Sequence, residues 1–465
     1  MKVNTICCIG AGYVGGPTMA VIAQQCPSLE VLVVDYNQSR IAAWNSDDLS
    51  QLPVYEPGLS EVISATRNKN LFFSTDIDTA IQKAEMIFMA VNTPTKTQGE
   101  GKGMAADLNH VENCARRIAQ VATSNKIVVE KSTLPVRTAE KIKEVLAENK
   151  NGVEFEVLSN PEFLAEGTAI QDLFKSDRVL VGGDSTESGK AAVASLVSIY
   201  SNWIPKEKIL TTNVWSSELS KLASNAMLAQ RISSINSLSA LCERTEASIQ
   251  DVSRAIGMDH RIGNKFLNAS VGFGGSCFQK DVLNLVYLCQ QYGLDEVAEY
   301  WHQVVKMNDY QKNRFAHLID TSIDASEENA IIGILGWAFK KNTNDSRESA
   351  AIYVAAQLLE KGYSLSIYDP MVSNERILSD LTLLFEAQNK NSEQVQNLLA
   401  NINITTEIKT ALLQADVAAI LTEWDEFKEF DWKEFLNSTP ETYRLLDGRN
   451  MVNRSLSDKI FTIGN

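Results

Sequence analysis

The sequence predicts an α/β protein with two Rossmann-like, doubly wound parallel sheets joined by a central all-α domain that contains one long helix. Short β-strand patterns alternate with helical patterns in the first part of the chain, and the alternation returns after residue 330. Between them, residues 215–245 contain neither glycine nor proline and read as a single helix. A chain of 465 residues is too long for one ordinary core. We therefore expect domains at 1–212, 213–325 and 326–465.

The first sheet begins with a glycine fingerprint. A strand pattern at 6–9 leads into Gly-x-Gly-x-x-Gly, with Gly10, Gly12 and Gly15, and then into a helical pattern. The first glycine makes the turn, the second admits a pyrophosphate, and the third lets helix and strand pack closely. Asp35 ends the second strand, where its carboxylate would bind ribose hydroxyls and repel a 2′-phosphate. These residues favour NAD over NADP, and the alternative is a glycine turn in an unrelated α/β sheet.

Polar segments follow the later strands of this sheet. Further strands are expected at 71–73, 86–91, 126–130 and 156–158, and the polar segments after them at 92–95, 131–135 and 159–163. Ligands of parallel sheets bind at the carboxyl ends of the strands. We therefore interpret these segments as cofactor and substrate contacts, with Glu162 pointing at the cleft, although each could equally be an ordinary turn.

The central helix at 215–245 is rich in small residues, which indicates close packing against other helices and a possible subunit interface. Lys221 and Asn225 are four residues apart and share one helix face. A lysine among small residues is unusual, and the alternative is a solvated surface side chain. Helical patterns continue to about residue 322.

A glycine-rich loop at 272–276 leads directly into another helical pattern. Cys277 then falls in or near the first helical turn, where free N–H groups and the helix dipole favour a thiolate. Asp281 follows four residues later on the same face. The alternative is a structural turn followed by a buried cysteine.

The second α/β unit lacks the glycine fingerprint. Strands are expected at 331–336, 365–370, 417–421 and 443–447, with a helix at 349–361. Lys340 and Lys341 follow the first of these strands and suit a diphosphate, unless they belong to a charged surface loop. Arg449 follows the last strand.

Composition excludes several classes of protein. The net charge of −15 and the absence of a long basic run argue against nucleic-acid binding. No apolar run is long enough to cross a bilayer, and the first residues enter a strand pattern rather than a secretory signal. The 7 cysteines are scattered without paired spacing, and the 4 histidines form no cluster. We therefore expect a cytoplasmic protein with reduced thiols, without a metal site or a membrane anchor.

Four segments carry a resemblance to a known family. They are Gly-Phe-Gly-Gly-Ser-Cys-Phe-Gln-Lys-Asp at 272–281, Ser-Asn-Pro-Glu-Phe-Leu-Ala-Glu-Gly at 159–167, Lys-Leu-Ala-Ser-Asn-Ala at 221–226, and Phe-Lys-Lys-x-Thr-x-Asp-x-Arg-Glu-Ser at 339–349. Together they are similar to the NAD-dependent dehydrogenases of UDP- and GDP-sugars, and within these to the animal-type branch that oxidises UDP-glucose. The likeness covers essentially the whole chain.

The resemblance implies oxidation of UDP-glucose to UDP-glucuronate, with two NAD reduced per turnover through a thiohemiacetal and a thioester on Cys277. The catalytic residues that it implies are Cys277, Lys221, Asp281, Glu162, Asn225 and Thr133. Those it implies along NAD are Gly10, Gly12, Tyr13, Val14, Gly15, Asp35, Arg40, Val91, Thr93, Thr133, Glu166, Cys277, Lys280 and Arg347. Those it implies at the substrate are Glu162, Phe163, Leu164, Glu166, Lys221, Asn225, Arg261, Phe266, Asn268, Ser270, Phe273, Gly274, Phe339, Lys340 and Arg449. It also implies a homo-oligomer with a dimer as its unit, expected to assemble into a hexamer, in which Arg261 reaches the substrate of a neighbouring subunit.

One residue departs from the family pattern: Asn268 stands where the animal-type enzymes commonly have lysine, which puts one charge contact with substrate in doubt. Within the family, the alternatives are UDP-N-acetylmannosamine and GDP-mannose as substrates. A two-electron β-hydroxyacid dehydrogenase would not need Cys277. An NAD-binding scaffold without catalysis would not need Cys277, Lys221, Asp281 and Glu162 together.

Overall fold

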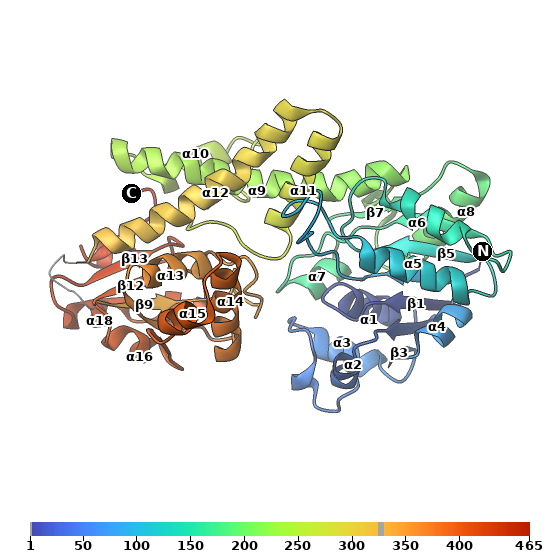
Figure 1. The fold of residues 1–465 in the computed structure, drawn as a ribbon, viewed down its shortest axis with the longest axis horizontal. Helices are drawn as coiled ribbons and strands as arrows, with labels where there is room; N and C mark the ends of the chain where they lie inside the picture. Colours follow the sequence, from blue (N-terminus) through green and yellow to red (C-terminus); the bar gives the residue numbers. More distant parts are fainter. Residues whose placement is uncertain (1, 324–329) are drawn as a thin grey trace. The chain divides into compact units, whose positions relative to one another are not determined.

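The computed structural model describes residues 2–323 and 330–465, which divide into two compact units, Met1–Ser224 and Asn225–Asn465. The division falls inside the long helix α9 (Val214–Thr245), which matches the single helix expected at 215–245 (Figure 1). The expected domain boundary after residue 212 stays a prediction, and the one after residue 325 lies outside the described residues.

The first unit contains an eight-stranded sheet in the order β3-β2-β1-β4-β5-β6-β7-β8. Neighbouring strands are parallel except β6 and β7, which run antiparallel where Ser159 pairs with Gly182. The predicted doubly wound sheet is confirmed, with β7 and β8 as an addition that the sequence analysis does not contain. The strands are β1 (Thr5–Ile9), β2 (Glu30–Val34), β3 (Leu71–Ser74), β4 (Met86–Met89), β5 (Lys126–Glu130), β6 (Phe155–Ser159), β7 (Val179–Gly182) and β8 (Ile209–Thr212).

Helices cover both faces of this sheet, because successive side chains of a strand point to opposite faces. From β1, Ile6 and Cys8 belong to one hydrophobic cluster with α1, α3, α7 and α8, whereas Cys7 and Ile9 belong to another with α4, α5 and α6. The helices are α1 (Gly15–Gln25), α2 (Gln38–Trp44), α3 (Leu59–Thr66), α4 (Ile77–Lys83), α5 (Asn109–Val121), α6 (Thr138–Ala147), α7 (Ala169–Phe174) and α8 (Glu187–Tyr200), with short 3₁₀ turns at Leu49–Gln51 and Lys206–Lys208.

The second unit combines helices with a six-stranded, fully parallel sheet in the order β11-β10-β9-β12-β13-β14. The strands are β9 (Ile331–Leu335), β10 (Ser364–Tyr368), β11 (Ile402–Ile404), β12 (Val417–Ile420), β13 (Arg444–Asp447) and β14 (Ile460–Thr462). The helices after α9 are α10 (Ile249–Gly257), α11 (Phe278–Gln291), α12 (Asp295–Thr321), α13 (Ala350–Glu360), α14 (Asn374–Ala387), α15 (Ser392–Leu399), α16 (Ile408–Leu413), α17 (Asp425–Glu429) and α18 (Trp432–Ser438), with a 3₁₀ turn at Arg454–Leu456.

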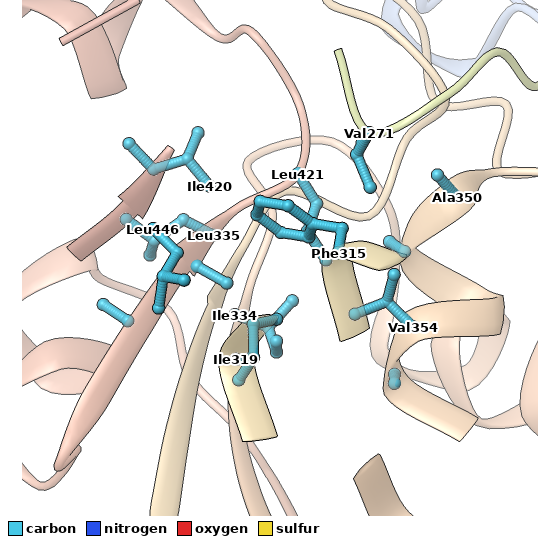
Figure 2. Close-up of a cluster of buried hydrophobic side chains, with 14 of the residues drawn as sticks. Val271, Phe315, Ile319, Ile334, Leu335, Ala350, Val354, Ile420, Leu421 and Leu446 are labelled. Atoms are coloured by element: carbon cyan, nitrogen blue, oxygen red, sulfur yellow. The ribbon is translucent and has the colours of Figure 1, made fainter. Parts of the chain in front are cut away.

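One hydrophobic core joins the helices of this unit to its sheet. Phe315 and Ile319 of α12 lie in a cluster with Ile334 and Leu335 of β9 and with Ile420 of β12 (Figure 2). The same cluster includes Val271, which immediately precedes the glycine-rich loop at 272–276 (Figure 2). The loop is therefore anchored at its start in the core of the unit.

No helix in the described parts of the chain has both the length and the apolar composition that a membrane span requires.

Candidate active site

The three glycines of the fingerprint do three different things. Gly10 has a φ of 111°, and a Cβ there would overlap the carbonyl oxygen of Ala90 in the neighbouring strand segment. A Cβ on Gly15 would overlap the backbone of Gly10, because α1 starts close against β1. A Cβ on Gly12, in contrast, would meet nothing within 4 Å. Open space at Gly12, beside the N-terminus of α1 and the half-buried Tyr13 and Val14, fits a dinucleotide pyrophosphate.

Asp35 lies at the end of β2 with only 4% of its surface exposed. Its carboxylate accepts the backbone N–H groups of Ala11 (3.0 Å) and Asn37 (2.9 Å) and pairs with Arg40 at 3.0 Å. The carboxylate is thus fixed beside the glycine turn, as a contact with ribose hydroxyls would require.

The segments after β4 and β5 are tied together at the same edge of the sheet. Thr93 donates a hydrogen bond to the carbonyl of Thr133 at 3.2 Å, and the Ser132 hydroxyl donates to the carbonyl of Val91 at 2.6 Å. Val91, Thr93 and Thr133 are therefore brought together, as the sequence analysis expects.

Glu162, in the segment after β6, is held by a buried lysine. The Lys131 ammonium at the end of β5 lies 2.7 Å from Glu162 Oε2 and is 2% exposed. Glu162 Oε1 accepts the backbone N–H groups of Phe163 (2.9 Å) and Leu164 (3.2 Å). Burial opposes ionisation of Glu162, but Lys131, the N–H of Phe163 and Lys221 outweigh it and lower the pKa of Glu162. Glu162 is therefore ionised. Glu166 lies in the same segment and is half-buried.

Lys221 is not the solvated lysine that the sequence left as an alternative. It is 7% exposed, and its ammonium lies 5.3 Å from the centre of the Phe163 ring. The guanidinium of Arg178 lies over the same ring at 3.9 Å. Lys221, Phe163 and Glu162 thus form one cluster in the first unit.

In the second unit, Cys277 is the N-cap of α11, and its carbonyl accepts the N–H of Asp281 at 2.8 Å. Its side chain is exposed, whereas the other cysteines of the described chain are buried. Burial raises the pKa of the Cys26 thiol to about 11 and that of Cys114 to about 12, so these thiols stay protonated at neutral pH. Cys277 is therefore an accessible thiol at a helix N-terminus, and the alternative of a buried structural cysteine is wrong.

Asp281 of α11 and Asn225 of α9 are hydrogen-bonded to each other. The Asn225 side-chain amide donates to Asp281 Oδ2 at 2.6 Å, and both side chains are buried. The Lys280 ammonium lies 3.9 Å from Asp281 Oδ1. The structure therefore joins α9 to α11 through two of the expected catalytic residues.

The glycines before Cys277 let the loop pack on the segment after β9. A Cβ on Gly274 would overlap the carbonyl of Glu348, and Gly275, with a φ of 88°, lies against the Phe339 ring. Arg449 donates to the carbonyl of Phe339 at 3.0 Å and pairs with Glu423 at 3.3 Å. Gly274, Phe339 and Arg449 are thus brought together.

The basic residues of this segment have separate partners. Lys340 lies 5.6 Å from the Phe339 ring centre, near this cluster. Lys341 pairs with the exposed Asp425 at 2.6 Å, as a surface lysine does. The half-exposed Arg347 pairs with Asp345 at 2.6 Å.

The start of the loop is held by side chains that the sequence analysis missed. Asn236 of α9 accepts the N–H of Ser270 at 2.8 Å. The Asn308 amide of α12 accepts the N–H of Phe273 at 2.8 Å and donates to the carbonyl of the same residue at 3.0 Å. Nothing in the local sequence marks these two asparagines, because each acts on a loop more than thirty positions away in the chain.

Three other expected substrate residues have exposed side chains. Arg261 follows α10, is 79% exposed and pairs with Asp259 at 2.6 Å. Phe266 is partly exposed and packs edge-on against Phe278 at 6.5 Å between ring centres. The Asn268 side chain is exposed.

No group of three or more His, Cys, Asp or Glu side chains in residues 2–323 and 330–465 could hold a metal ion.

Comparison with protein families matches the chain over three consecutive segments. The models are described as the NAD binding domain (residues 4–204), the central domain (215–310) and the UDP binding domain (333–454) of the UDP-glucose/GDP-mannose dehydrogenase family.

Individual relatives extend over the whole length. The chain is 56% identical to UDP-glucose 6-dehydrogenase 3 of Arabidopsis thaliana over 462 residues, which is 99% of this chain and 95% of that protein. It is 56% identical to UDP-glucose 6-dehydrogenase of Drosophila melanogaster, over 98% of this chain and 94% of that protein. Among solved structures, a UDP-glucose dehydrogenase from Pyrobaculum islandicum superposes with a TM-score of 0.83 at 28% identity, covering 100% of this chain and 98% of that one.

Proposed function

Since the chain belongs to the UDP-glucose/GDP-mannose dehydrogenase family, we propose that it oxidises UDP-glucose at C6 to UDP-glucuronate and reduces two NAD per turnover. UDP-glucose 6-dehydrogenases of Arabidopsis thaliana and Drosophila melanogaster are among the relatives that are more than half identical to it. The observation that carries the proposal is Cys277, an exposed thiol on a helix N-terminus that follows a glycine-rich loop. A two-electron dehydrogenase has no use for such a thiol.

The oxidation of an alcohol to an acid sets a separate task for each residue. Bound NAD supplies the hydride acceptor. Lys221 takes the proton of the C6 alcohol or stabilises the developing alkoxide, and Asn225 donates a hydrogen bond to it. The Cys277 sulfur adds to the aldehyde carbon and a proton goes to the aldehyde oxygen, which gives a thiohemiacetal. Loss of a hydride to bound NAD and of the hydroxyl proton then gives a thioester. Glu162, already ionised, accepts a proton from the water that hydrolyses the thioester. Asp281 and Thr133 orient water and neighbouring groups.

We assign the binding residues as the resemblance implies. The residues assigned to NAD are Gly10, Gly12, Tyr13, Val14, Gly15, Asp35, Arg40, Val91, Thr93, Thr133, Glu166, Cys277, Lys280 and Arg347. The residues assigned to the nucleotide sugar are Glu162, Phe163, Leu164, Glu166, Lys221, Asn225, Arg261, Phe266, Asn268, Ser270, Phe273, Gly274, Phe339, Lys340 and Arg449. The three domains at 1–212, 213–325 and 326–465 then correspond to cofactor binding, the helical centre and UDP binding.

We further propose a cytoplasmic homo-oligomer with a dimer as its unit and a hexamer as its full assembly. Support comes from apolar side chains exposed on α9, among them Met227 and Leu241, and from Met258 just after α10. The exposed Arg261 would then reach the substrate of a neighbouring subunit.

A substrate panel tests the function. Purified protein is given limiting UDP-glucose, GDP-mannose or UDP-N-acetylmannosamine with excess NAD, and NADH formed per sugar consumed is measured. We expect rapid turnover with UDP-glucose alone and a ratio close to two. A ratio close to one would contradict the four-electron chemistry, and faster turnover of either other sugar would move the chain to a different branch of the family. No turnover of any sugar would support an NAD-binding scaffold.

A further inference from the structure

We propose that Lys131 is a positioning residue for the hydrolytic half of the reaction, because it fixes the Glu162 carboxylate, ionised, in the orientation needed to take a proton from water. This inference rests on the proposed function. The inference adds to that function a residue that contacts Glu162 rather than the substrate.

The Lys131 ammonium has a position set by three oxygen atoms. Besides Glu162 Oε2 at 2.7 Å, it lies 3.2 Å from Asn160 Oδ1 and 3.3 Å from the hydroxyl of Tyr200. An ammonium has three N–H donors, and these three oxygens match them. Lys131, Asn160 and Tyr200 are 2%, 1% and 3% exposed, so solvent on that side cannot replace a lost partner of the ammonium.

The partners of Lys131 are themselves fixed. The Tyr200 hydroxyl donates to Asn160 Oδ1 at 2.7 Å, and the Asn160 amide donates to the carbonyl of Leu180 at 2.8 Å. Tyr200 ends α8 and Leu180 lies in β7, so the network connects the ends of β5 and β6 with both elements. An ammonium held in this way can orient a carboxylate rather than merely neutralise it.

Glu162 is surrounded so that few other groups could replace Lys131. One oxygen takes two backbone N–H groups and the other takes the ammonium. The charged and titratable groups that face Glu162 are Lys131, which immediately follows β5, Tyr200 of α8 and Lys221 of α9. Of the two lysines, Lys131 makes the ion pair, whereas Lys221 acts on Glu162 more weakly. Loss of Lys131 would remove the main countercharge of a carboxylate that is only 15% exposed, which favours protonation of Glu162.

The step that depends on this is thioester hydrolysis. The water oxygen bonds to the thioester carbon, a water proton goes to the Glu162 carboxylate, and the carbon–sulfur bond breaks with its electron pair leaving on the Cys277 sulfur. No oxidant or reductant is consumed. A protonated Glu162 cannot accept the proton, so hydrolysis stops while both hydride transfers remain possible.

The test is Lys131→Met, which keeps length and removes charge. We expect a burst of two NADH per site at the wild-type rate, followed by turnover slowed on the order of a hundredfold at neutral pH. Intact-mass measurement should show an acyl group on Cys277. Removal of Lys131 raises the pKa of Glu162, so turnover should recover as the pH is raised. Glu162→Gln should accumulate the same acyl group with no such recovery.

The matched control is Lys126→Met, which removes the buried lysine at the other end of β5, where it donates to the carbonyl of Gln82 at 2.9 Å. It should keep the wild-type pH profile and carry no acyl group. If Lys131→Met does not fold, Tyr200→Phe replaces it and should slow turnover several-fold with an unchanged burst.

Three results would overturn the proposal. Lys131→Met could turn over at the wild-type rate, or it could turn over slowly with the pH profile of wild type. Tyr200→Phe, where it is used instead, could turn over at the wild-type rate. In these cases wild type still gives two NADH per UDP-glucose and Glu162→Gln still holds the acyl group, so the proposed function stands. A wild type that does not oxidise UDP-glucose contradicts both.

Discussion

The choice between NAD and NADP depends on Asp35. Its buried carboxylate would lie against a 2′-phosphate, and Arg40 is already paired with it at 3.0 Å. Asp35→Ser removes the repulsion and frees Arg40 for a phosphate. We expect kcat/KM of wild type to be much higher with NAD than with NADP. The variant should lower the ratio of these two kcat/KM values by at least about tenfold, or about 1.4 kcal/mol.

The control for this prediction is Asp35→Ser combined with Arg40→Ala. Its kcat/KM with NADP should be lower than that of Asp35→Ser alone, whereas its kcat/KM with NAD should stay as low as in Asp35→Ser. Equal kcat/KM values for the two cofactors in wild type would show that Asp35 does not select between them.

Cys277 separates the two oxidations. The first hydride transfer needs a base, and the second needs a tetrahedral donor that the thiol creates by adding to the aldehyde. Cys277→Ser replaces the thiol with a hydroxyl that stays protonated near neutral pH. We expect at most about one NADH per site, or a bound ester that hydrolyses very slowly, and net turnover lower by several orders of magnitude. Single-turnover absorbance measures both quantities.

Mass spectrometry after addition of UDP-glucose and NAD provides the comparison. Glu162→Gln should carry a thioester on Cys277, and Cys277→Ser should never carry one. Repeated turnover of Cys277→Ser to the uronic acid at nearly the wild-type rate would mean that the thiol forms no covalent intermediate.

Among single residues, the sequence identified those whose role depends on the residues next to them in the chain. The glycine fingerprint, Asp35 at a strand end and Cys277 at a helix start are each recognisable within a few positions. Lys131 is different: its polar segment was expected at the ligand edge, but its partner Tyr200 is 69 positions away. A partner so distant in the chain leaves no local sequence pattern, so the network around Glu162 could not be predicted from the sequence.

The start of α6 is capped by a buried glutamate from another element. Glu218 of α9 accepts the backbone N–H groups of Arg137 and Ala139, both at 2.8 Å. Glu130, the last residue of β5, is buried beside it. Burial, and then the neighbouring Glu218 carboxyl, raise the pKa of Glu130 well above its usual value. Burial also raises the pKa of Glu218, despite its two N–H donors.

These shifts predict how stability changes with pH. A carboxyl with a raised pKa keeps its proton in the folded state after the unfolded chain has lost it, so stability falls as pH rises above the unfolded value. Glu130→Gln removes the larger contribution while preserving shape. We expect wild type to lose more free energy of unfolding than the variant between pH 5 and pH 8, as measured by urea denaturation.

The exposed Glu140→Gln, in α6 itself, is the control and should follow wild type. If Glu130→Gln lost as much stability over this range as wild type, the Glu130 carboxyl would have to be ionised in the folded protein.

Elements with strong internal patterns were predictable, and their directions were not always so. The long helix was predictable because no glycine or proline interrupts it. It begins at Val214, one residue before the expected start. Length alone does not explain why β7 and β8 were missed, because β3 and β4 also have 4 residues and were predicted. In β8, Thr211 and Thr212 interrupt the apolar run by which the other strands were recognised. The antiparallel pairing of β6 with β7 could not be foreseen, because a strand's side-chain period is the same in either direction.

For the whole molecule, exposed apolar side chains are the feature that most needs a partner. Met227, Leu238 and Leu241 on α9 are 52%, 38% and 58% exposed, and Met258 after α10 is 82% exposed. Monomeric proteins rarely leave such side chains grouped in contact with water. We therefore expect sedimentation to show a dimer or a larger assembly at assay concentration, and an active monomer would contradict the proposed oligomer.

A mixing experiment tests whether subunits share an active site. Arg261→Ala and Cys277→Ala should each be inactive alone. If Arg261 serves the site of a neighbouring chain, a mixed dimer contains one complete site, with Cys277 from the first variant and Arg261 from the second. Random pairing of equal amounts makes half of the dimers mixed, so co-expression should restore at most about a quarter of wild-type activity. If Arg261 serves its own chain, every site lacks one of the two residues and nothing is restored. Activity of Arg261→Ala alone would show that this exposed arginine, paired with Asp259, is not needed by either chain.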